Sequence, residues 1–270
     1  MAVHPTAIIG DSVNMADDVQ IGPYVVIDGE VSIGRGTKVM AHANITGYTQ
    51  IGENCEIHMG VVLGHEPQDL VFSKETSFLK IGDNNVFREY SWVHRGTKPG
   101  SCTTIGNNNY FMGFSHVAHN CVIGNNTIIA SNALLAGYVE VGDRAFVSGN
   151  IVVHQFTRIG AYAMVSGLSA VNKDIPPYML AGGRPAVVTG LNVVGLRRNG
   201  FNADQRRSIK QAHDILFRQR LATKRAVEAL KELPQSSEVD TIIRFIETSQ
   251  RGLCSSTASR HAQPFGSDDE

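Results

Sequence analysis

Residues 121–142 read CVIGNNTIIASNALLAGYVEVG, and similar residues recur in this stretch at every sixth position. A six-residue unit with two inward-facing residues, separated by one outward-facing residue, is typical of a short strand followed by a corner. The larger inward residues here are Ile123, Ile129, Leu135 and Val141. Each is preceded, two positions earlier, by a small or β-branched residue: Cys121, Thr127, Ala133 and Val139.

The same period runs through most of the chain. Of the 29 positions reached in steps of six from residue 3 to residue 171, 26 hold Ile, Val, Leu, Met or Phe. Three such strands close one triangular coil, and stacked coils form parallel sheets around a filled interior. We therefore predict an all-β solenoid over residues 1–185. The exceptions Asp69, Glu75 and Pro99 predict loops near residues 65–77 and 96–102, and loops on a regular scaffold commonly carry binding groups.

Helical signals replace the six-residue period after the solenoid, over residues 186–254. Asn202 precedes a stretch with apolar residues at helical spacing and is predicted to be an N-cap. Thr223 and Ser236 are predicted to cap two further helices, the last of which ends near Gly252.

Composition and length are those of a soluble globular protein, with 270 residues, 42% hydrophobic and 18% charged. Its 4 cysteines form no Cys-x-x-Cys pair, which favours reduced thiols in a cytoplasmic protein over a zinc knuckle or a disulfide framework. The first residues show no basic region followed by an apolar stretch, and no long apolar run occurs, so we expect neither export nor a membrane span. We expect no metal and no cofactor. Residues 255–270 are predicted to form a disordered tail.

The near-neutral net charge hides an asymmetry. Residues 184–231 contain 11 Lys and Arg against 3 Asp and Glu, a net of +8, which leaves 13 against 22, a net of -9, for the remainder. This basic region indicates either a surface for an anionic partner or arginines that simply solvate helix faces. Nucleic acid is a poorer partner because no aromatic residues are interleaved with the basic ones.

The register of the repeat decides which way the histidines of SHVAHN (115–120) face. His116 lies between two inward positions and points outward, whereas His119 lies at the next corner. Steps of one coil from His119 reach Gly137 and Gln155, with His154 beside Gln155. Successive coils are about 4.8 Å apart, so these residues are neighbours. An imidazole that accepts a proton, beside a backbone N–H that stabilises an oxyanion, is suited to acyl transfer.

Two of the three outward faces of the solenoid are apolar, which predicts that they are covered. One face carries Tyr110, Ile128, Phe146 and Met164, and the next carries His116, Leu134, Val152 and Ala170. The third is more polar, with Val122, Glu140 and Arg158. Packing around a threefold axis would cover two faces and place the histidines in a cleft between subunits, where an apolar groove could hold a long chain.

Several motifs, in order and spacing, resemble one known family: HPTAIIG, IGPYVVI, PQDL, VHRGT, SHVAHNCVIGNN, LLAGYVEV, VHQFTRIG, DIPPY and GLNVVGLRRNGF. This family is the cytoplasmic UDP-N-acetylglucosamine O-acyltransferases, which begin lipid A synthesis, and the resemblance runs from about residue 2 to 253. It implies a homotrimer of left-handed parallel β-helices, each with a C-terminal helical domain. It also implies transfer of an (R)-3-hydroxyacyl chain from acyl carrier protein to the 3-hydroxyl of the UDP-sugar.

The resemblance also implies roles for individual residues. His119 is similar to the general base, Gly137 to the oxyanion donor, and Asn120 occupies the position that orients the base. Gly167 lies where the family sets acyl-chain length, and its missing side chain leaves room for a longer chain. Substrate contacts are implied for Gln68, Asp69, His94, His116, Tyr138, His154, Gln155, Asn192 and Arg198. Docking of the acidic carrier protein is predicted for Arg206, Arg207, Lys210, Arg218, Arg220, Lys224 and Arg225.

The sequence departs from the family pattern at four positions. Asn120 replaces the usual Asp, Tyr138 the usual His, Val71 a common Lys, and Val194 a common acidic residue. These changes leave a 3-amino sugar nucleotide open as an alternative acceptor. Two other hypotheses are a zinc carbonic anhydrase type, with a metal held by His94, His116 and His119, and a catalytically silent hexapeptide-repeat protein.

Overall fold

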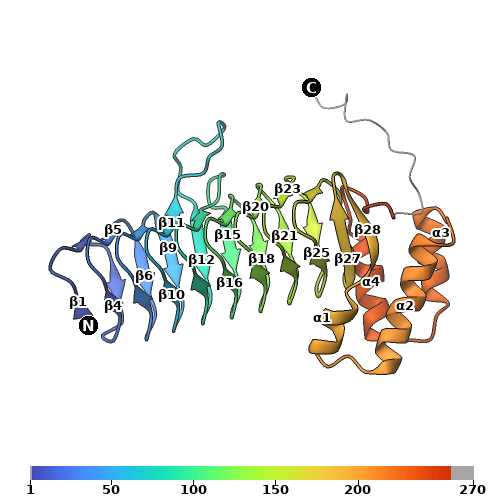
Figure 1. Cartoon of the computed structure of the whole chain (residues 1–270). Helices are drawn as coiled ribbons and strands as arrows, with labels where there is room; N and C mark the ends of the chain where they lie inside the picture. The colour runs from blue at the N-terminus through green and yellow to red at the C-terminus, as the bar shows by residue number, and fades with distance from the viewer. Residues whose placement is uncertain (1, 257–270) are drawn as a thin grey trace.

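The computed structural model describes residues 2–256, which form 28 short strands followed by four helices. The strands wind into a long three-sided prism, and the helices lie at the end of the prism farthest from the N-terminus (Figure 1). The coils turn in the left-handed sense, so the predicted left-handed parallel β-helix with C-terminal helices is confirmed.

Each side of the prism is one sheet, and the three sheets are named here by their strands. Sheet A contains β1 (Ala2–Val3), β4 (Gln20–Ile21), β7 (Lys38–Val39), β10 (Glu56–Ile57), β13 (Val86–Phe87), β16 (Tyr110–Phe111), β19 (Ile128–Ile129), β22 (Phe146–Val147), β25 (Met164–Val165), β27 (Met179–Gly183) and β28 (Ala186–Leu191). Sheet B contains β2 (Ile8–Ile9), β5 (Val26–Ile27), β8 (Asn44–Ile45), β11 (Val62–His65), β14 (Trp92–His94), β17 (His116–Val117), β20 (Leu134–Leu135), β23 (Val152–Val153) and β26 (Ala170–Val171). Sheet C contains β3 (Asn14–Met15), β6 (Val31–Ile33), β9 (Tyr48–Ile51), β12 (Phe78–Ile81), β15 (Cys102–Ile105), β18 (Val122–Ile123), β21 (Glu140–Val141) and β24 (Arg158–Ile159).

The core of the prism consists of the inward residues of the six-residue period. Val117 pairs with Leu135, and Ile123 pairs with Val141, so neighbouring coils are in register at a spacing of one triangular turn. Ile129 and Leu135 are fully buried. Burial of one such side chain contributes about 1.5–3 kcal/mol, and repetition in every coil stabilises the stack.

The helical domain follows β28. It contains α1 (Val193–Arg198), α2 (Ala203–Phe217), α3 (Thr223–Lys231) and α4 (Ser237–Glu247). Asn202 caps α2 as predicted, because its side chain accepts the Gln205 N–H and the Gln205 side chain accepts the Asn202 N–H in return.

The other two helix starts differ in detail from the prediction. Thr223 is the first residue of α3, and the cap position belongs to Ala222. Ser236 is at the N-cap of α4, but its hydroxyl donates to the Glu238 carboxylate and not to the helix backbone.

The chain after α4 returns to the solenoid and does not extend the helix to Gly252. The Ser249 hydroxyl donates to Asp174 at 2.7 Å, and the Cys254 N–H donates to the Asp174 carbonyl at 2.8 Å. Ser255, predicted to begin a tail, accepts the Val188 N–H of β28 at 2.7 Å. Residues 257–270 of that predicted tail lie outside the described residues.

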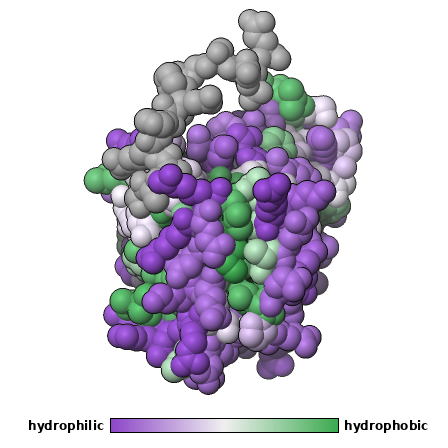
Figure 2. All heavy atoms as spheres, turned by 90° about the vertical axis from the view of Figure 1, so that its right-hand side faces the viewer, coloured by the Kyte–Doolittle hydropathy of each residue, from purple (hydrophilic) through white to green (hydrophobic). Residues whose placement is uncertain are grey.

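The end of the molecule formed by the helical domain is mostly hydrophilic on its surface (Figure 2). Among residues 2–256, no helix has the length and apolarity that crossing a membrane requires.

Candidate functional site

Two loops interrupt the solenoid where the six-residue pattern fails. Residues 66–77 connect β11 to β12, and residues 95–101 connect β14 to β15. The first loop projects from the prism beside β11 (Figure 1). The pairing register widens from 18 residues in regular coils to 30 between Leu63 and Val93, and to 24 between Val93 and Val117. Each loop therefore adds a multiple of six residues to its coil, so the six-residue pattern continues in the same register after the loop.

His119 lies at the corner after β17, and both of its ring nitrogens have partners. Nδ1 is 3.1 Å from Asn120 Oδ1, and Nε2 is 3.3 Å from Asp69 Oδ2. Asn120 Oδ1 also accepts the backbone N–H of Thr97 at 2.9 Å, which fixes the orientation of the amide. Because an amide oxygen only accepts hydrogen bonds, Nδ1 must donate its proton to it. The neutral ring therefore carries its lone pair on Nε2, the atom beside Asp69.

The backbone of Asn120 is itself suited to this corner. Its φ angle is 59°, in the left-handed region that Asn tolerates better than most residues. Its N–H donates to the Thr103 hydroxyl at 2.8 Å. The carboxylate of Asp69 accepts the Thr97 hydroxyl at 3.3 Å, so both loops are tied to the corner that holds the histidine.

Gly137 lies against His119 on the next coil. A Cβ atom at this position would be 2.4 Å from Cε1 of His119, so only glycine leaves the imidazole in place. Within residues 2–256 the Gly137 N–H donates to no protein group, which leaves it free to stabilise an oxyanion. The Tyr138 ring meets the His119 ring edge to face, with centroids 5.4 Å apart.

His94 and His116 form a second, more buried pair next to this corner. Their ring centroids are 5.2 Å apart, and His94 Nδ1 lies 2.7 Å from the Glu66 carbonyl oxygen. Burial, reinforced by His94 and His119, lowers the pKa of His116 to about 4, and burial also lowers the pKa of His94. Both rings are therefore neutral near pH 7.

Nε2 of each of these two histidines is buried without a hydrogen-bond partner among the described residues, as is the Trp92 Nε1–H. Buried polar atoms are normally paired, so unpaired ones clustered beside the corner histidine indicate a polar ligand. The structure thus brings together seven of the predicted site residues: Asp69, His94, His116, His119, Asn120, Gly137 and Tyr138.

Four other predicted residues are exposed on the surface of the single chain: Gln68, His154, Gln155 and Gly167. Nδ1 of the exposed His154 ring lies 3.0 Å from the Gln155 carbonyl oxygen. Gly167 is exposed at the corner after β25, where a Cβ would meet its nearest atom, the Gly149 carbonyl oxygen, at 3.4 Å. None of these has a hydrogen bond to His119 among residues 2–256.

Asn192 and Arg198 lie on a different face, in a cavity of about 460 Å³ between sheet A and α1. Asn192 also caps α1, because its Oδ1 accepts the Gly195 N–H at 3.0 Å and its Nδ2 donates to the Tyr162 carbonyl at 2.9 Å. Asn192 therefore has a structural role at the start of α1 that needs no ligand.

Sequence reasoning missed Trp92, Thr97 and Arg144. Arg144 lines the same cavity as Arg198. It stands one coil after Asn126, another residue of that cavity that the sequence analysis did not single out. Thr97 lies in a loop outside the repeat, where no periodic signal exists.

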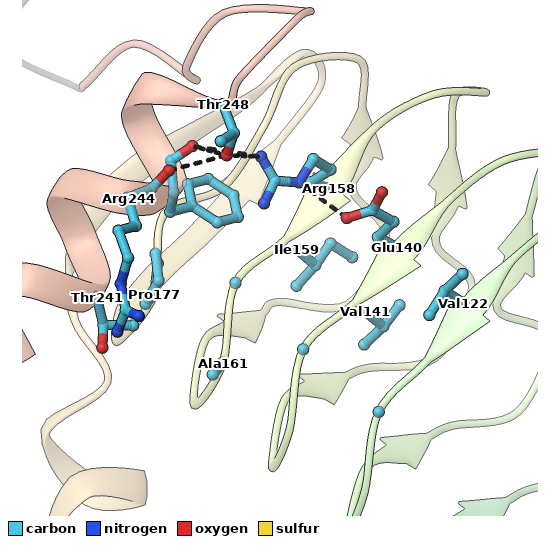
Figure 3. Close-up of a pocket in the computed structure, with 14 residues that line it drawn as sticks. Val122, Glu140, Val141, Arg158, Ile159, Ala161, Pro177, Thr241, Arg244 and Thr248 are labelled. Carbon is cyan, nitrogen blue, oxygen red and sulfur yellow. Dashed lines mark hydrogen bonds and ion pairs between the residues drawn. The ribbon is translucent and has the colours of Figure 1, made fainter. Parts of the chain in front are cut away.

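A further hollow of about 430 Å³ lies between sheet C and α4 (Figure 3). Arg158 spans it, with Nε 2.9 Å from the Glu140 carboxylate and Nη1 2.9 Å from the Thr248 hydroxyl. Its guanidinium also lies over the Phe245 ring, 4.3 Å from the centroid. None of the predicted site residues lines this hollow, and its contacts join the helical domain to the solenoid.

No group of three or more His, Cys, Asp or Glu side chains suited to a metal ion occurs in the described part of the chain. His119 is instead held by Asn120 and Asp69. The geometry of the three histidines therefore gives no support to the zinc hypothesis.

The repeats and the corner histidine define a hexapeptide-repeat transferase. Residues 30–65 and 102–137 match the family model described as bacterial transferase hexapeptide (six repeats). Residues 174–254 match the model described as Udp N-acetylglucosamine O-acyltransferase; Domain 2.

Full-length relatives specify the family. The acyl-[acyl-carrier-protein]–UDP-N-acetylglucosamine O-acyltransferase of Thermodesulfovibrio yellowstonii is 46% identical over 254 residues, which cover 93% of this chain and 98% of the relative. The enzyme of the same name from Syntrophobacter fumaroxidans is 44% identical, covering 94% and 99%. The chain belongs to the family of acyl-[acyl-carrier-protein]–UDP-N-acetylglucosamine O-acyltransferases and is an acyltransferase.

Solved structures agree with this assignment. The UDP-N-acetylglucosamine acyltransferase LpxA from Bacteroides fragilis matches with a TM-score of 0.90 at 41% identity, over 93% of this chain and 99% of that one. LpxA from Acinetobacter baumannii matches with a TM-score of 0.91 at 39% identity, over 94% and 100%.

Proposed function

We propose that this protein transfers an (R)-3-hydroxyacyl group from acyl carrier protein to the 3-position of the sugar of UDP-N-acetylglucosamine, in lipid A biosynthesis. The observation that carries the proposal is the contact between His119 and Gly137, which sets an oriented imidazole against a free backbone N–H in a chain of this family.

The proposed chemistry begins with His119 as general base. Its Nε2 takes the proton of the sugar 3-hydroxyl while the oxygen attacks the thioester carbonyl carbon. The Gly137 N–H stabilises the tetrahedral oxyanion. Collapse of this intermediate breaks the carbon–sulfur bond, and the imidazolium returns the proton to the thiolate of the carrier.

Asp69 supplies the charge that Asn120 lacks in this scheme. Its carboxylate lies 3.3 Å from Nε2, where it stabilises the imidazolium as that forms. Asn120 has the complementary task of fixing Nδ1 as the donor nitrogen. The Asn120 amide thus orients the imidazole, and the Asp69 carboxylate stabilises its positive charge.

Substrate positions follow from the unpaired groups and from the family. The neutral His94 and His116 offer Nε2 atoms to sugar and phosphate groups, with Gln68 at the rim. Tyr138, His154 and Gln155 are proposed to contact the donor near the thioester. Gly167, without a side chain, leaves room for the acyl chain.

A homotrimer would complete the site. Asn192 and Arg198 line sheet A, whereas His119 lies at the corner between sheets B and C, so one chain alone keeps them apart. Apolar side chains are exposed along the edge between sheets A and B, where Tyr24 is 58% exposed, Tyr90 50% and Phe114 51%. Packing of these edges around a threefold axis would bury them and bring the sheet A cavity of one subunit to His119 of its neighbour.

The acidic carrier protein is proposed to dock on the helical domain. Of the predicted basic residues, Arg207 pairs with Asp204, Arg218 pairs with Asp214, and Arg206 donates to the Phe201 carbonyl. The remaining exposed cations have no ion pair within residues 2–256: Lys210, Arg220, Lys224 and Arg225. We assign the docking contacts to these four.

The proposed location is the cytoplasm. All four cysteines, Cys55, Cys102, Cys121 and Cys254, are free thiols, which fits a reducing compartment.

A 3-amino sugar nucleotide is a second candidate acceptor, favoured by Asn120. A neutral amine attacks a thioester with its own lone pair and needs less help from a base than a hydroxyl does. The uncharged Asn120 beside the imidazole would suffice for an amine acceptor, because that acceptor needs a weaker base.

One assay separates these alternatives. The purified protein is incubated with acyl carrier thioesters of several chain lengths and with UDP-N-acetylglucosamine or its 3-amino analogue, and products are identified by mass spectrometry. The proposal expects one 3-hydroxyacyl length to dominate and the hydroxyl acceptor to react faster. Preference for the amine would assign the second acceptor, and absence of product with every pair would favour the silent-protein hypothesis.

A further inference from the structure

The cavity between sheet A and α1 contains a second guanidinium besides that of Arg198. Arg144 lies at the corner between β21 and β22 and lines this cavity. Its Nη1 donates to Asn199 Oδ1 at 2.8 Å. No carboxylate pairs with Arg144 or with Arg198 in the described part of the chain, so both cations remain available to a ligand.

The position of Arg144 is fixed by the end of α1. Asn199, the C-cap residue, donates from Nδ2 to the Gly195 carbonyl at 2.8 Å and from its backbone N–H to the same oxygen at 3.0 Å. Its Oδ1 is thereby aimed at Arg144. A guanidinium has five N–H donors, and this hydrogen bond uses one of them.

The walls of the cavity define the ligand that fits. The side formed by the solenoid is apolar, with Ile128, Phe146 and Met164 in one row of sheet A. Arg198 enters from α1 and Arg144 from the solenoid corner. An acyl chain alone would leave two unpaired cations against it, whereas a nucleoside diphosphate offers a flat ring to the apolar wall and oxygens to the two guanidiniums.

We propose that Arg144 binds the diphosphate of the acceptor together with Arg198, and that Asn199 positions its guanidinium. This inference rests on the proposed function, because it takes the sugar nucleotide as the acceptor. Arg144 is then a specificity residue for the nucleotide and has no part in acyl transfer itself.

A structural alternative makes a different prediction. If Arg144 only ties α1 to the solenoid, loss of its hydrogen bond to Asn199 would matter as much as loss of its charge. Arg144→Gln removes the charge and keeps an amide donor. Asn199→Ala removes the bond and keeps the cation. Lys80→Gln is a matched control, because Lys80 is an exposed cation on sheet C, away from the cavity.

The experiment measures calorimetric binding of UDP and of uridine to the full chain, with melting temperatures as a check on folding. For Arg144→Gln we expect the Kd of UDP to rise roughly tenfold or more, as for a lost charge-assisted hydrogen bond. The Kd of uridine should change much less. Asn199→Ala should weaken UDP binding by a smaller factor than Arg144→Gln, and Lys80→Gln should have no effect.

Kinetics keep this inference separate from the proposed function. Arg144→Gln should raise KM for UDP-N-acetylglucosamine and leave KM for the acyl carrier thioester unchanged. Wild-type acyl transfer together with unchanged UDP binding in Arg144→Gln would overturn the Arg144 inference alone. Equal losses in Arg144→Gln and Asn199→Ala would also overturn it, in favour of the tether. Absence of wild-type acyl transfer would contradict the proposed function instead.

Discussion

Asn120 Oδ1 lies 3.1 Å from His119 Nδ1 and at the same time accepts the Thr97 N–H. A neutral amide thus orients the imidazole, while the carboxylate of Asp69 lies on the opposite side of the ring at Nε2. Asn120 thus orients the ring and Asp69 supplies the negative charge. Substitution of Asn120 tests this arrangement most easily.

Replacement of Asn120 should separate the two effects. Asn120→Gly keeps the left-handed backbone without strain and removes the amide, so we expect kcat to fall about 10–100-fold while the acceptor KM changes little. Asn120→Asp should retain activity and move the acid limb of the pH–rate profile to higher pH, because a carboxylate favours the charged ring. Wild-type kcat in Asn120→Gly would show that the amide does not orient the base.

Because Gly137 lies so close to His119, we predict that one added methyl group at residue 137 greatly reduces activity. Gly137→Ala places a Cβ 2.4 Å from the imidazole and must displace the ring, so we expect kcat/KM to fall about 100-fold or more. Gly190→Ala, where nothing lies within 4 Å of an added Cβ, is the matched control. Both variants are assayed beside their melting curves. Near-normal kcat/KM in a folded Gly137→Ala would exclude this arrangement.

The buried His116 predicts a specific pH dependence of stability. Its pKa is lowered to about 4 in the folded chain, below the ordinary value of 6.5, so the unfolded chain binds more protons between these two values. Stability is therefore lost as pH falls from about 6.5 towards 4, by on the order of 1–3 kcal/mol from this group. His116→Gln should show a smaller loss over the same interval in urea unfolding at fixed protein concentration. Identical slopes for variant and wild type would refute the assignment.

The unpaired cations of the helical domain predict selective effects on the donor. Charge reversal in the double variant Arg220→Glu with Lys224→Glu should raise KM for the acyl carrier thioester about tenfold and leave KM for the sugar nucleotide unchanged. Added salt should weaken the wild-type interaction in the same direction. Lys80→Glu on sheet C is the charge-matched control. Equal changes in both KM values would reject this docking surface.

The solenoid was predictable because every coil repeats the same local pattern. The inward positions of Ile123, Ile129 and Leu135 can each be recognised from the six residues around them. Contacts between distant parts of the chain are therefore not needed to predict the solenoid. The facing of His119 and its contact with Gly137 followed from that register.

The contacts made by the loops were not predictable in the same way. Asp69 was expected to meet the sugar, and its place beside His119 Nε2 depends on how residues 66–77 fold back. Thr97 lies in the second loop, where no period operates. Likewise, Ser249, two residues after the end of α4, bonds Asp174 across the domain junction, a contact 75 residues apart in sequence.

The most direct test of the central claim compares wild type with His119→Ala in the initial rate of 3-hydroxyacyl transfer from acyl carrier protein to UDP-N-acetylglucosamine. The melting temperatures of the two proteins must be equal, so that a difference in rate does not reflect unfolding. We predict that the wild type forms the 3-acylated sugar nucleotide and that His119→Ala is slower by about 10²–10⁴-fold. A folded His119→Ala that retains the wild-type rate would contradict the assignment of His119 as the base.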